Sequence, residues 1–371
     1  MHDCVFTDID MDTGLFLEML KIDSTSGNEA GFAGFLEERL RTSRCDVERF
    51  EVGDGSVNLL FSWGKPDVVF CTHLDTVPPY ISPETKDGIV YGRGSCDAKG
   101  QIIAMYEACR ILESKGYDGF GLLLLAGEET GSFGAKSFRE LHPGAEWLIV
   151  GEPTDNHMAS ASKGTKAFEV TFDGVAFHSG YPRHGVSAVN MFNDFMNALG
   201  SIVFPEDEVL GDTTWNIGRL VSDNPQNILS DSLTCRVYFR TTFESDEMVC
   251  NVMRNMAGPD ARLRFGRRKV QDGSDIVGKD VAQWQKSMKV RALGGDSPTR
   301  YETLDGFRTK PVAFGSDAPQ LTNFRRKILC GPGSILVAHR PDEHVILSEI
   351  EAATENYVRM FEMIKGKTGI L

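Results

Sequence analysis

The chain has 371 residues, which is long for one compact domain and suits two. Hydrophobic residues make up 41% and charged residues 25%, as in ordinary globular proteins, and no apolar stretch approaches the roughly 18 residues of a membrane-spanning helix. The net charge of −14 argues against nucleic acid and against anionic membrane surfaces as partners. The eight cysteines are scattered without a C-x-x-C pair, and no secretory signal begins the chain, so we expect a cytoplasmic protein with reduced thiols.

The first part of the chain alternates helices and strands. Ser26 and Glu29 have the spacing of a capping box, which predicts a helix over the residues that follow. Further along the chain, the apolar patterns predict strands over 67–75, 122–125 and 147–152 and helices over 97–116 and 132–141. Near-continuous apolar strands alternating with helices predict an α/β fold with a mostly parallel sheet flanked by helices.

The pattern changes from about Lys166. Strands 166–172, 213–221 and 233–241 alternate polar and apolar residues, helices are expected over 189–199 and 246–256, and a last strand over 261–266. This β-α-β-β-α-β order is that of a ferredoxin-like α+β domain. We therefore expect a domain of residues 166–273, inserted between the two parts of a larger domain, 1–165 and 274–371.

Polar residues follow the ends of the parallel strands. They are His73, Asp75, Asp97, Glu128, Glu129 and Glu152, and a late segment adds His339. Taken singly, a core histidine, a helix cap, a turn residue or a solvated loop acid explains each of them. Taken together, four or five carboxylates at one sheet edge could not all stay ionised without cations. Imidazoles and carboxylates suit zinc, with manganese or cobalt close behind, and because no thiolate is needed we interpret Cys71 and Cys96 as packing residues.

The adjacent Glu128 and Glu129 have a simple interpretation in a two-metal site. Neighbouring side chains diverge at a strand-to-helix turn, so one glutamate can bind metal while the other reaches a metal-bound water. A carboxylate beside such a water can take its proton. The pair is then one ligand and one general base.

Nucleotide binding is the competing interpretation, since "GSFGAKS" and "GRGSCDAKG" look like phosphate loops. In the first segment Ala135 separates Gly134 from Lys136, which breaks the P-loop pattern. The second segment lacks the glycine spacing of dinucleotide-binding proteins.

The motifs H-x-D, G-R-G-S-x-D-x-K-G, G-E-E, G-E-P-T and the late A-H, in this order, resemble the co-catalytic zinc deacylases and peptidases. That family includes acetylornithine deacetylase, succinyl-diaminopimelate desuccinylase, aminoacylase and glutamate carboxypeptidase. The resemblance covers nearly the whole chain and implies two divalent metal ions. It implies that Asp97 bridges them, that His73 and Glu152 complete one site, and that Glu129 and His339 complete the other. Glu128 would be the base, and Asp75 would hold His73 in the correct tautomer.

The resemblance also makes the inserted domain a lid and dimerisation domain, which predicts a homodimer. In "FHSGYP", His178 matches the histidine that reaches the partner subunit's active site and polarises the scissile carbonyl. Asn227 and Arg240 match substrate-binding positions, and Gly315 and Ser316 in "GSDAP" resemble a substrate-binding loop.

Arg240 could hold a substrate carboxylate in bidentate fashion, and Arg236 shares its face of the strand. This stretch departs from the family pattern at two positions: Ser230 replaces a usual proline, and Tyr238 stands where an aspartate is frequent. The departures bear on the carboxylate contact and leave the metal ligands untouched.

The expected reaction is hydrolysis of the amide in a small N-acyl amino acid. Glu152 is a glutamate, as in the deacylases and carboxypeptidases, where tripeptidase-like members usually have aspartate. The segment "AHRPDE" looks closer to acetylornithine deacetylase than to the desuccinylase, so acetylornithine or a related N-acyl amino acid is the favoured substrate. A dipeptidase or carboxypeptidase of the same family is the alternative. A non-hydrolytic metal-binding relative would be expected to lack Glu128, which is present.

Overall fold

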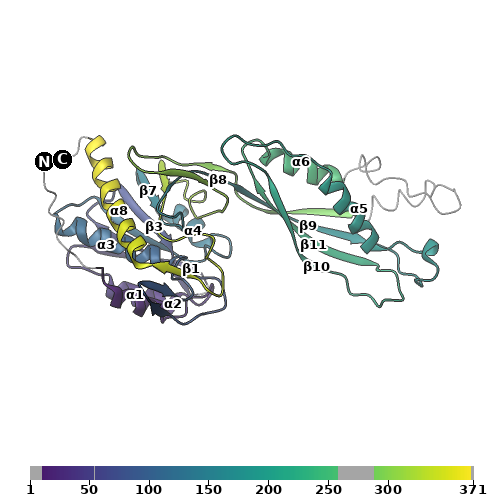
Figure 1. The fold of residues 1–371 in the computed structure, drawn as a ribbon, viewed down its shortest axis with the longest axis horizontal. Coiled ribbons are helices and arrows are strands. Elements are labelled where there is room, and N and C mark those ends of the chain that lie inside the picture. The colour runs from purple at the N-terminus through teal and green to yellow at the C-terminus, as the bar shows by residue number, and fades with distance from the viewer. Residues whose placement is uncertain (1–10, 54, 258–287, 369–371) are drawn as a thin grey trace. The chain divides into compact units, whose positions relative to one another are not determined.

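The computed structural model describes residues 11–53, 55–257 and 288–368, and the chain divides into two compact units (Figure 1). The core unit comprises residues 1–160, 300–312 and 316–371, and the inserted unit comprises residues 161–299 and 313–315. Among the described helices, none is long and apolar enough to cross a membrane.

A six-stranded sheet forms the centre of the core unit, in the order β1-β2-β6-β3-β7-β15. Its strands are β1 (Asp46–Gly53), β2 (Ser56–Trp63), β6 (Phe120–Leu125), β3 (Val68–His73), β7 (Trp147–Val150) and β15 (Arg326–Leu329). The last four in this order pair in parallel, while β1 and β2 form an antiparallel hairpin at one edge. The mostly parallel sheet of the α/β prediction is confirmed, with two antiparallel strands added to it.

Helices cover both faces of this sheet, which explains the leucine run. Leu122 and Leu124 belong to the main hydrophobic cluster, whereas Leu123 and Leu125, pointing the other way, are equally buried. The helices of the core unit are α1 (Thr13–Leu20), α2 (Ala30–Arg39), α3 (Lys99–Ser114), α4 (Phe133–Leu141) and α8 (Leu347–Thr368).

The capping box predicted before α2 is wrong. Helix α2 begins at Ala30 with Glu29 as its N-cap residue, and no side chain caps it. The Ser26 hydroxyl donates to Oδ2 of Asp75 at 2.7 Å instead. As a cap the hydroxyl would accept a neutral backbone N–H, whereas here it donates to a buried carboxylate, which makes a stronger, charge-assisted hydrogen bond.

Two small sheets complete the strands. One has the order β13-β8-β14, with β13 (Thr299–Arg300), β8 (Met158–Ser162) and β14 (Thr309–Val312). The other has the order β16-β5-β4, with β16 (His344–Ile346), β5 (Ile89–Tyr91) and β4 (Glu84–Lys86). The pairing of β16 with β5 brings the segment after His339 to the loop that carries Asp97.

The inserted unit has the predicted ferredoxin-like α+β fold. Its elements are β9 (Gly164–Asp173), α5 (Ala188–Gly200), β10 (Thr214–Val221), β11 (Ser232–Thr241), α6 (Asp246–Met256) and β12 (Met288–Gly294). The sheet order is β10-β11-β9-β12, with every neighbouring pair antiparallel. Both helices pack on one hydrophobic cluster with this sheet.

The predicted end of the inserted domain at residue 273 is wrong. The strand expected over 261–266 lies outside the described residues, and the fourth strand is β12, so the unit extends to Thr299 and begins at Ala161. Met288 and Val290 contact its hydrophobic cluster, while Lys289 and Arg291 pair with carboxylates of β9. The boundary was missed because the sequence of β12, with basic residues at alternate positions, also fits a polar surface segment of the core unit.

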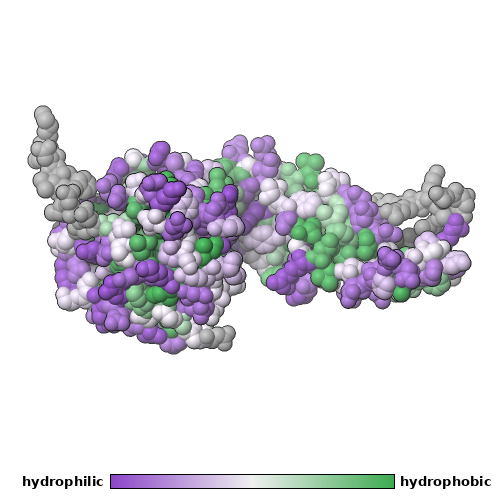
Figure 2. Space-filling view, turned by 60° about the horizontal axis from the view of Figure 1, so that its bottom comes forward, coloured by the Kyte–Doolittle hydropathy of each residue, from purple (hydrophilic) through white to green (hydrophobic). Residues whose placement is uncertain are grey.

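Hydrophobic side chains gather on the surface of the inserted unit (Figure 2). Most of the large hydrophobic side chains that are exposed among the described residues belong to it: Val175, Phe177, Tyr181, Val189, Val203, Leu220, Val221, Ile228 and Tyr238.

Candidate active site

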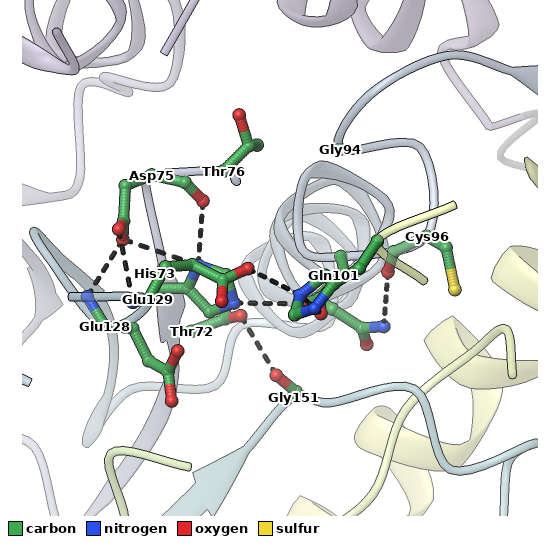
Figure 3. A network of polar contacts seen from close by, with 12 residues as sticks. Thr72, His73, Asp75, Thr76, Gly94, Cys96, Gln101, Glu128, Glu129 and Gly151 are labelled. Carbon is green, nitrogen blue, oxygen red and sulfur yellow. Dashed lines mark hydrogen bonds and ion pairs between the residues drawn. The ribbon is translucent and has the colours of Figure 1, made fainter. Parts of the chain in front are cut away.

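Asp75 organises the carboxyl end of the parallel sheet. Its Oδ1 accepts the backbone N–H of Glu128 at 3.0 Å, and its Oδ2 accepts that of Glu129 at 3.2 Å (Figure 3). Oδ2 also accepts the hydroxyl of Ser26. The side chain is completely buried. One carboxylate after β3 therefore fixes the turn after β6, where the two glutamates stand side by side.

His73 is oriented from both sides of its ring. Nδ1 lies 2.9 Å from the backbone carbonyl oxygen of Asp75, and Nε2 lies 2.9 Å from Oδ1 of Asp97. The contact expected from the Asp75 carboxylate is longer, at 3.6 Å. A proton on Nδ1 therefore has a carbonyl to bind, which leaves Nε2 to act as a ligand.

His339 joins the same group from the opposite side of Asp97. Its Nε2 lies 3.3 Å from Oδ2 of Asp97 and 2.9 Å from Oε1 of Glu129. Candidate ligand atoms of His73, Asp97 and Glu129 all lie within 4.8 Å of one another. Residues from four separate segments of the chain thus converge on Asp97.

The charges in this cluster are strongly coupled. Burial alone would lower the pKa of His73 and raise that of Asp97, but their mutual hydrogen bond and those with Asp75 and His339 reverse both effects. The pKa of His73 lies well above its usual range and that of Asp97 lies below it. Hydrogen bonds with Asp97 and Glu129 raise the pKa of His339 to about 10.

Two more carboxyl groups beside this cluster, those of Glu152 and Glu128, have raised pKa values. Burial, together with the negative charges of Asp97 and Glu128, raises the pKa of Glu152 well above its usual range. Burial and the charge of Asp317 do the same to Glu128, against the opposing effect of His73. Among the described residues, the carboxylate of Glu128 has no hydrogen-bond partner.

Divalent cations suit this donor set. Two imidazoles and three carboxylates are ligand types that zinc accepts. His73, Asp97 and Glu129 lie close enough to share an ion, and His339 contacts both Asp97 and Glu129. A cation here would also take over the charge balance that the two protonated histidines otherwise supply. Cys71 and Cys96 are buried, and burial raises the pKa of both thiols, as expected of packing residues.

Sequence reasoning assigned no role to Asp317 or Glu343 and interpreted Ser26 as a helix cap. Ser26 holds Asp75, the buried Asp317 adds negative charge beside Glu128 and Glu152, and the buried Glu343 contacts the loop before Asp97. Asp317 and Glu343 do stand in quoted motifs, "GSDAP" and "AHRPDE", and their position there was the available signal.

His178 and Asn227 lie next to each other in the inserted unit. The backbones of His178 and Ile228 form an isolated antiparallel β-bridge, and the backbone carbonyl of Asn227 accepts the N–H of Ser179 at 2.8 Å. Nδ1 of the exposed His178 accepts the backbone N–H of Gly180 at 3.1 Å, so in the neutral ring the proton resides on Nε2. The ring therefore presents a donor at its outer nitrogen.

Arg240 lies on β11, with its guanidinium 5.1 Å from the ring centre of Tyr238. Among the described residues it forms no ion pair, whereas Arg236 lies 3.6 Å from Glu169. A methyl group added at Gly315 would stand 3.9 Å from a guanidinium nitrogen of Arg240. Ser316 belongs to the core unit, where its buried hydroxyl accepts the N–H of Ala318.

Comparison with known proteins identifies the family. The model of peptidase family M20/M25/M40 matches residues 69–363, which include every residue of the cluster around Asp97. The chain belongs to this family. It is a metal-dependent hydrolase that acts on amide bonds. A probable carboxypeptidase of Aspergillus niger is 30% identical, over 93% of this chain and 88% of the relative. A peptidase M20 domain-containing protein of Schizosaccharomyces pombe is 31% identical, over 93% and 83%.

Solved structures of M20 relatives share the fold, including the inserted unit. A tripeptidase from Staphylococcus aureus superposes with a TM-score of 0.73 at 21% identity, covering 93% of this chain and 96% of that one. A metallo-carboxypeptidase from Sulfolobus solfataricus gives a TM-score of 0.69 at 15% identity, covering 94% and 98%.

Proposed function

We propose that this M20 hydrolase is a carboxypeptidase or dipeptidase that removes the C-terminal residue of short peptides. The observation that carries the proposal is Glu128, a carboxylate without a hydrogen-bond partner beside the ligand cluster around Asp97. The relatives named as probable carboxypeptidases, one of them matched over 93% of this chain and 88% of its own length, support the choice of substrate. The acetylornithine substrate favoured from the sequence lacks such support, and the alternative fits better.

Two divalent metal ions, zinc before cobalt or manganese, are part of the proposal. His73, Asp97 and Glu152 would hold one ion, and Asp97, Glu129 and His339 the other. Such ions, when bound, polarise the amide carbonyl and make water more acidic.

Glu128 has two tasks in the proposed reaction. Its carboxylate takes the proton of the attacking water as the water oxygen bonds to the carbonyl carbon. It then delivers this proton to the amide nitrogen as the carbon–nitrogen bond breaks. Both oxygens of Asp75 hold the backbone of the glutamate pair, which keeps Glu128 at a fixed place while its charge changes.

The inserted unit would recognise the substrate. Arg240, which has no carboxylate partner among the described residues, is proposed to bind the C-terminal carboxylate of the peptide, with Asn227, Gly315 and Ser316 as further substrate contacts. His178 is proposed to donate from Nε2 to the carbonyl oxygen, acting in the site of the partner subunit of a homodimer. The hydrophobic surface of the inserted unit supports association of two copies.

A substrate panel tests this proposal. Dipeptides, tripeptides, N-acetylornithine and other N-acyl amino acids would be assayed with added zinc or cobalt, each with a free and with an esterified C-terminus. We expect kcat/KM to be highest for peptides with a free C-terminal carboxylate. Esterification should lower kcat/KM by an amount that corresponds to about 1.5–3 kcal/mol of transition-state stabilisation, the contribution of a hydrogen bond to a charged group.

Arg240→Met should make the enzyme indifferent to esterification. Arg236→Met is the matched control, because Arg236 lies on the same strand and contacts Glu169. If only N-acyl amino acids were cleaved, the peptidase assignment would be wrong. If Arg240→Met still preferred the free acid, the carboxylate would bind elsewhere.

A further inference from the structure

Glu343 occupies an unusual position for a carboxylate. It is 1% exposed, and its Oε1 accepts three backbone N–H groups of one short loop, from Gly94 at 3.0 Å, Cys96 at 3.1 Å and Asp97 at 3.1 Å. Its Oε2 pairs with the guanidinium of Arg93, which is 3% exposed. Its own carbonyl accepts a fourth N–H, from Gly92 at 3.0 Å. The loop that ends in Asp97 is thus wrapped around this one residue.

The sheet topology explains how Glu343 reaches the loop. It directly precedes β16, and Gly92 directly follows β5, while these two strands pair antiparallel with His344 opposite Tyr91. Residues 246 positions apart, Asp97 and Glu343, are therefore brought together by the backbone and then joined by the side chain.

Arg93 extends this connection to the second candidate ligand. Its guanidinium also donates to the carbonyl of Arg340 at 3.4 Å, next to His339, and to that of Pro79 at 3.3 Å. His339 has a left-handed backbone conformation, with φ of 63°, so its side-chain direction depends on the segment that follows it. The pair of Arg93 and Glu343 thus contacts the backbone on both sides of the cluster.

We infer that Glu343, held by Arg93, is a positioning residue that fixes the spacing of Asp97 and His339 for metal binding. The inference rests on the metal centre of the proposed function. Neither residue touches substrate, and neither is a ligand. One carboxylate oxygen of Asp97 contacts His73 and the other contacts His339. A small shift of the loop that carries Asp97 therefore changes both contacts. Groups that orient ligands in this way typically change metal affinity 10–100-fold when removed.

The test compares metal binding with stability. Metal-depleted parent protein, Glu343→Gln and the double variant Arg93→Met/Glu343→Gln would be titrated with Zn²⁺ against a competing chelator and with Co²⁺ by its visible spectrum. The single variant leaves the buried Arg93 unpaired and can unfold for that reason alone. The double variant removes this charge, so it keeps the experiment informative.

Glu107→Gln is the matched control. Glu107 is a buried carboxylate of α3 in the same unit, 2% exposed, paired with Arg110 at 2.9 Å and bonded to the backbone of Asp12. We expect both Glu343 variants to bind Zn²⁺ 10–100-fold more weakly and to change the Co²⁺ spectrum. Glu107→Gln should lower the melting temperature with unchanged metal affinity.

Two results would overturn the inference. If the folded Glu343 variants bound Zn²⁺ as tightly as the parent and gave the same Co²⁺ spectrum, Glu343 would stabilise the fold only. If the parent itself bound neither ion, the proposed metal centre would be wrong and this inference with it.

Discussion

The substitution Glu128→Gln separates proton transfer from metal binding. Its amide keeps the size of the side chain, and the backbone N–H that Asp75 holds is unaffected, so the geometry of the turn should persist. An amide cannot take the proton of the attacking water, and loss of a general base typically slows a reaction by about 10²–10⁴-fold, or about 3–5 kcal/mol. We expect kcat to fall by this factor while the metal content stays at that of the parent.

Glu129→Gln is the matched comparison, because Asp75 holds its backbone in the same way. Its Oε1 lies 2.9 Å from Nε2 of His339, within the ligand cluster, so this variant should lose metal. Metal analysis of the purified variants by mass spectrometry, beside kcat with saturating zinc, decides between the roles. Loss of metal from Glu128→Gln with full metal in Glu129→Gln would reverse the assignment.

Two further predictions concern residues outside the ligand cluster. His178→Ala should lose about 10²–10³-fold in rate with its metals intact, and mixing it with Glu128→Ala subunits should restore activity if the histidine acts in the partner's site; no recovery despite proven subunit exchange would refute sharing. Burial raises the pKa of Glu29 in the folded protein above its ordinary value of 4.5. The protonated side chain therefore contributes to stability at low pH, and this contribution is lost as the pH rises through the pKa of the folded state. Glu29→Gln should therefore gain melting temperature relative to the parent at pH 8 and not at pH 4; an equal difference at both would refute this.

The ligand cluster was predictable because its residues follow strand ends. His73 directly ends β3, and Glu129 and Glu152 follow β6 and β7, three parallel neighbours whose carboxyl ends meet at one edge. The order of strands was not needed for this expectation. Asp97 was also expected at the end of a parallel strand, and this was wrong: it lies in the loop between β5 and α3. His339 comes from a later segment and follows no strand of that sheet directly.

The contacts of the supporting residues were not predictable from the sequence, although Asp75 itself was expected at the site. Glu343 and Asp75 act mainly on backbone N–H groups, which every residue except proline has, so their partners leave no pattern in the sequence. Ser26 was misinterpreted as a helix cap because a serine before a helix can either cap the helix or bind another group. Only the fold shows that its hydroxyl donates a hydrogen bond to a carboxylate 49 positions away. The predicted boundary of the inserted unit was wrong for a similar reason, because β12 can be assigned to this unit only from its pairing with β9 in the fold.

The adjacency of Glu128 and Glu129 follows from how Asp75 is used. A single buried carboxylate accepts both backbone N–H groups, so the turn is stabilised by negative charge while its two side chains add more of it. Together with Glu152 and Asp317, the site then gathers more carboxylates than its two histidines neutralise. Burial first, and then the charges of neighbouring carboxylates, raise the pKa values of Glu128 and Glu152. Buried carboxylates crowded in this way oppose folding, and the proposed cations would offset this cost, because cations stabilise the ionised form of every carboxylate around them. The carboxylate of Glu128 has no hydrogen-bond partner among the described residues, so in the proposed hydrolysis it is placed to take the proton of the attacking water.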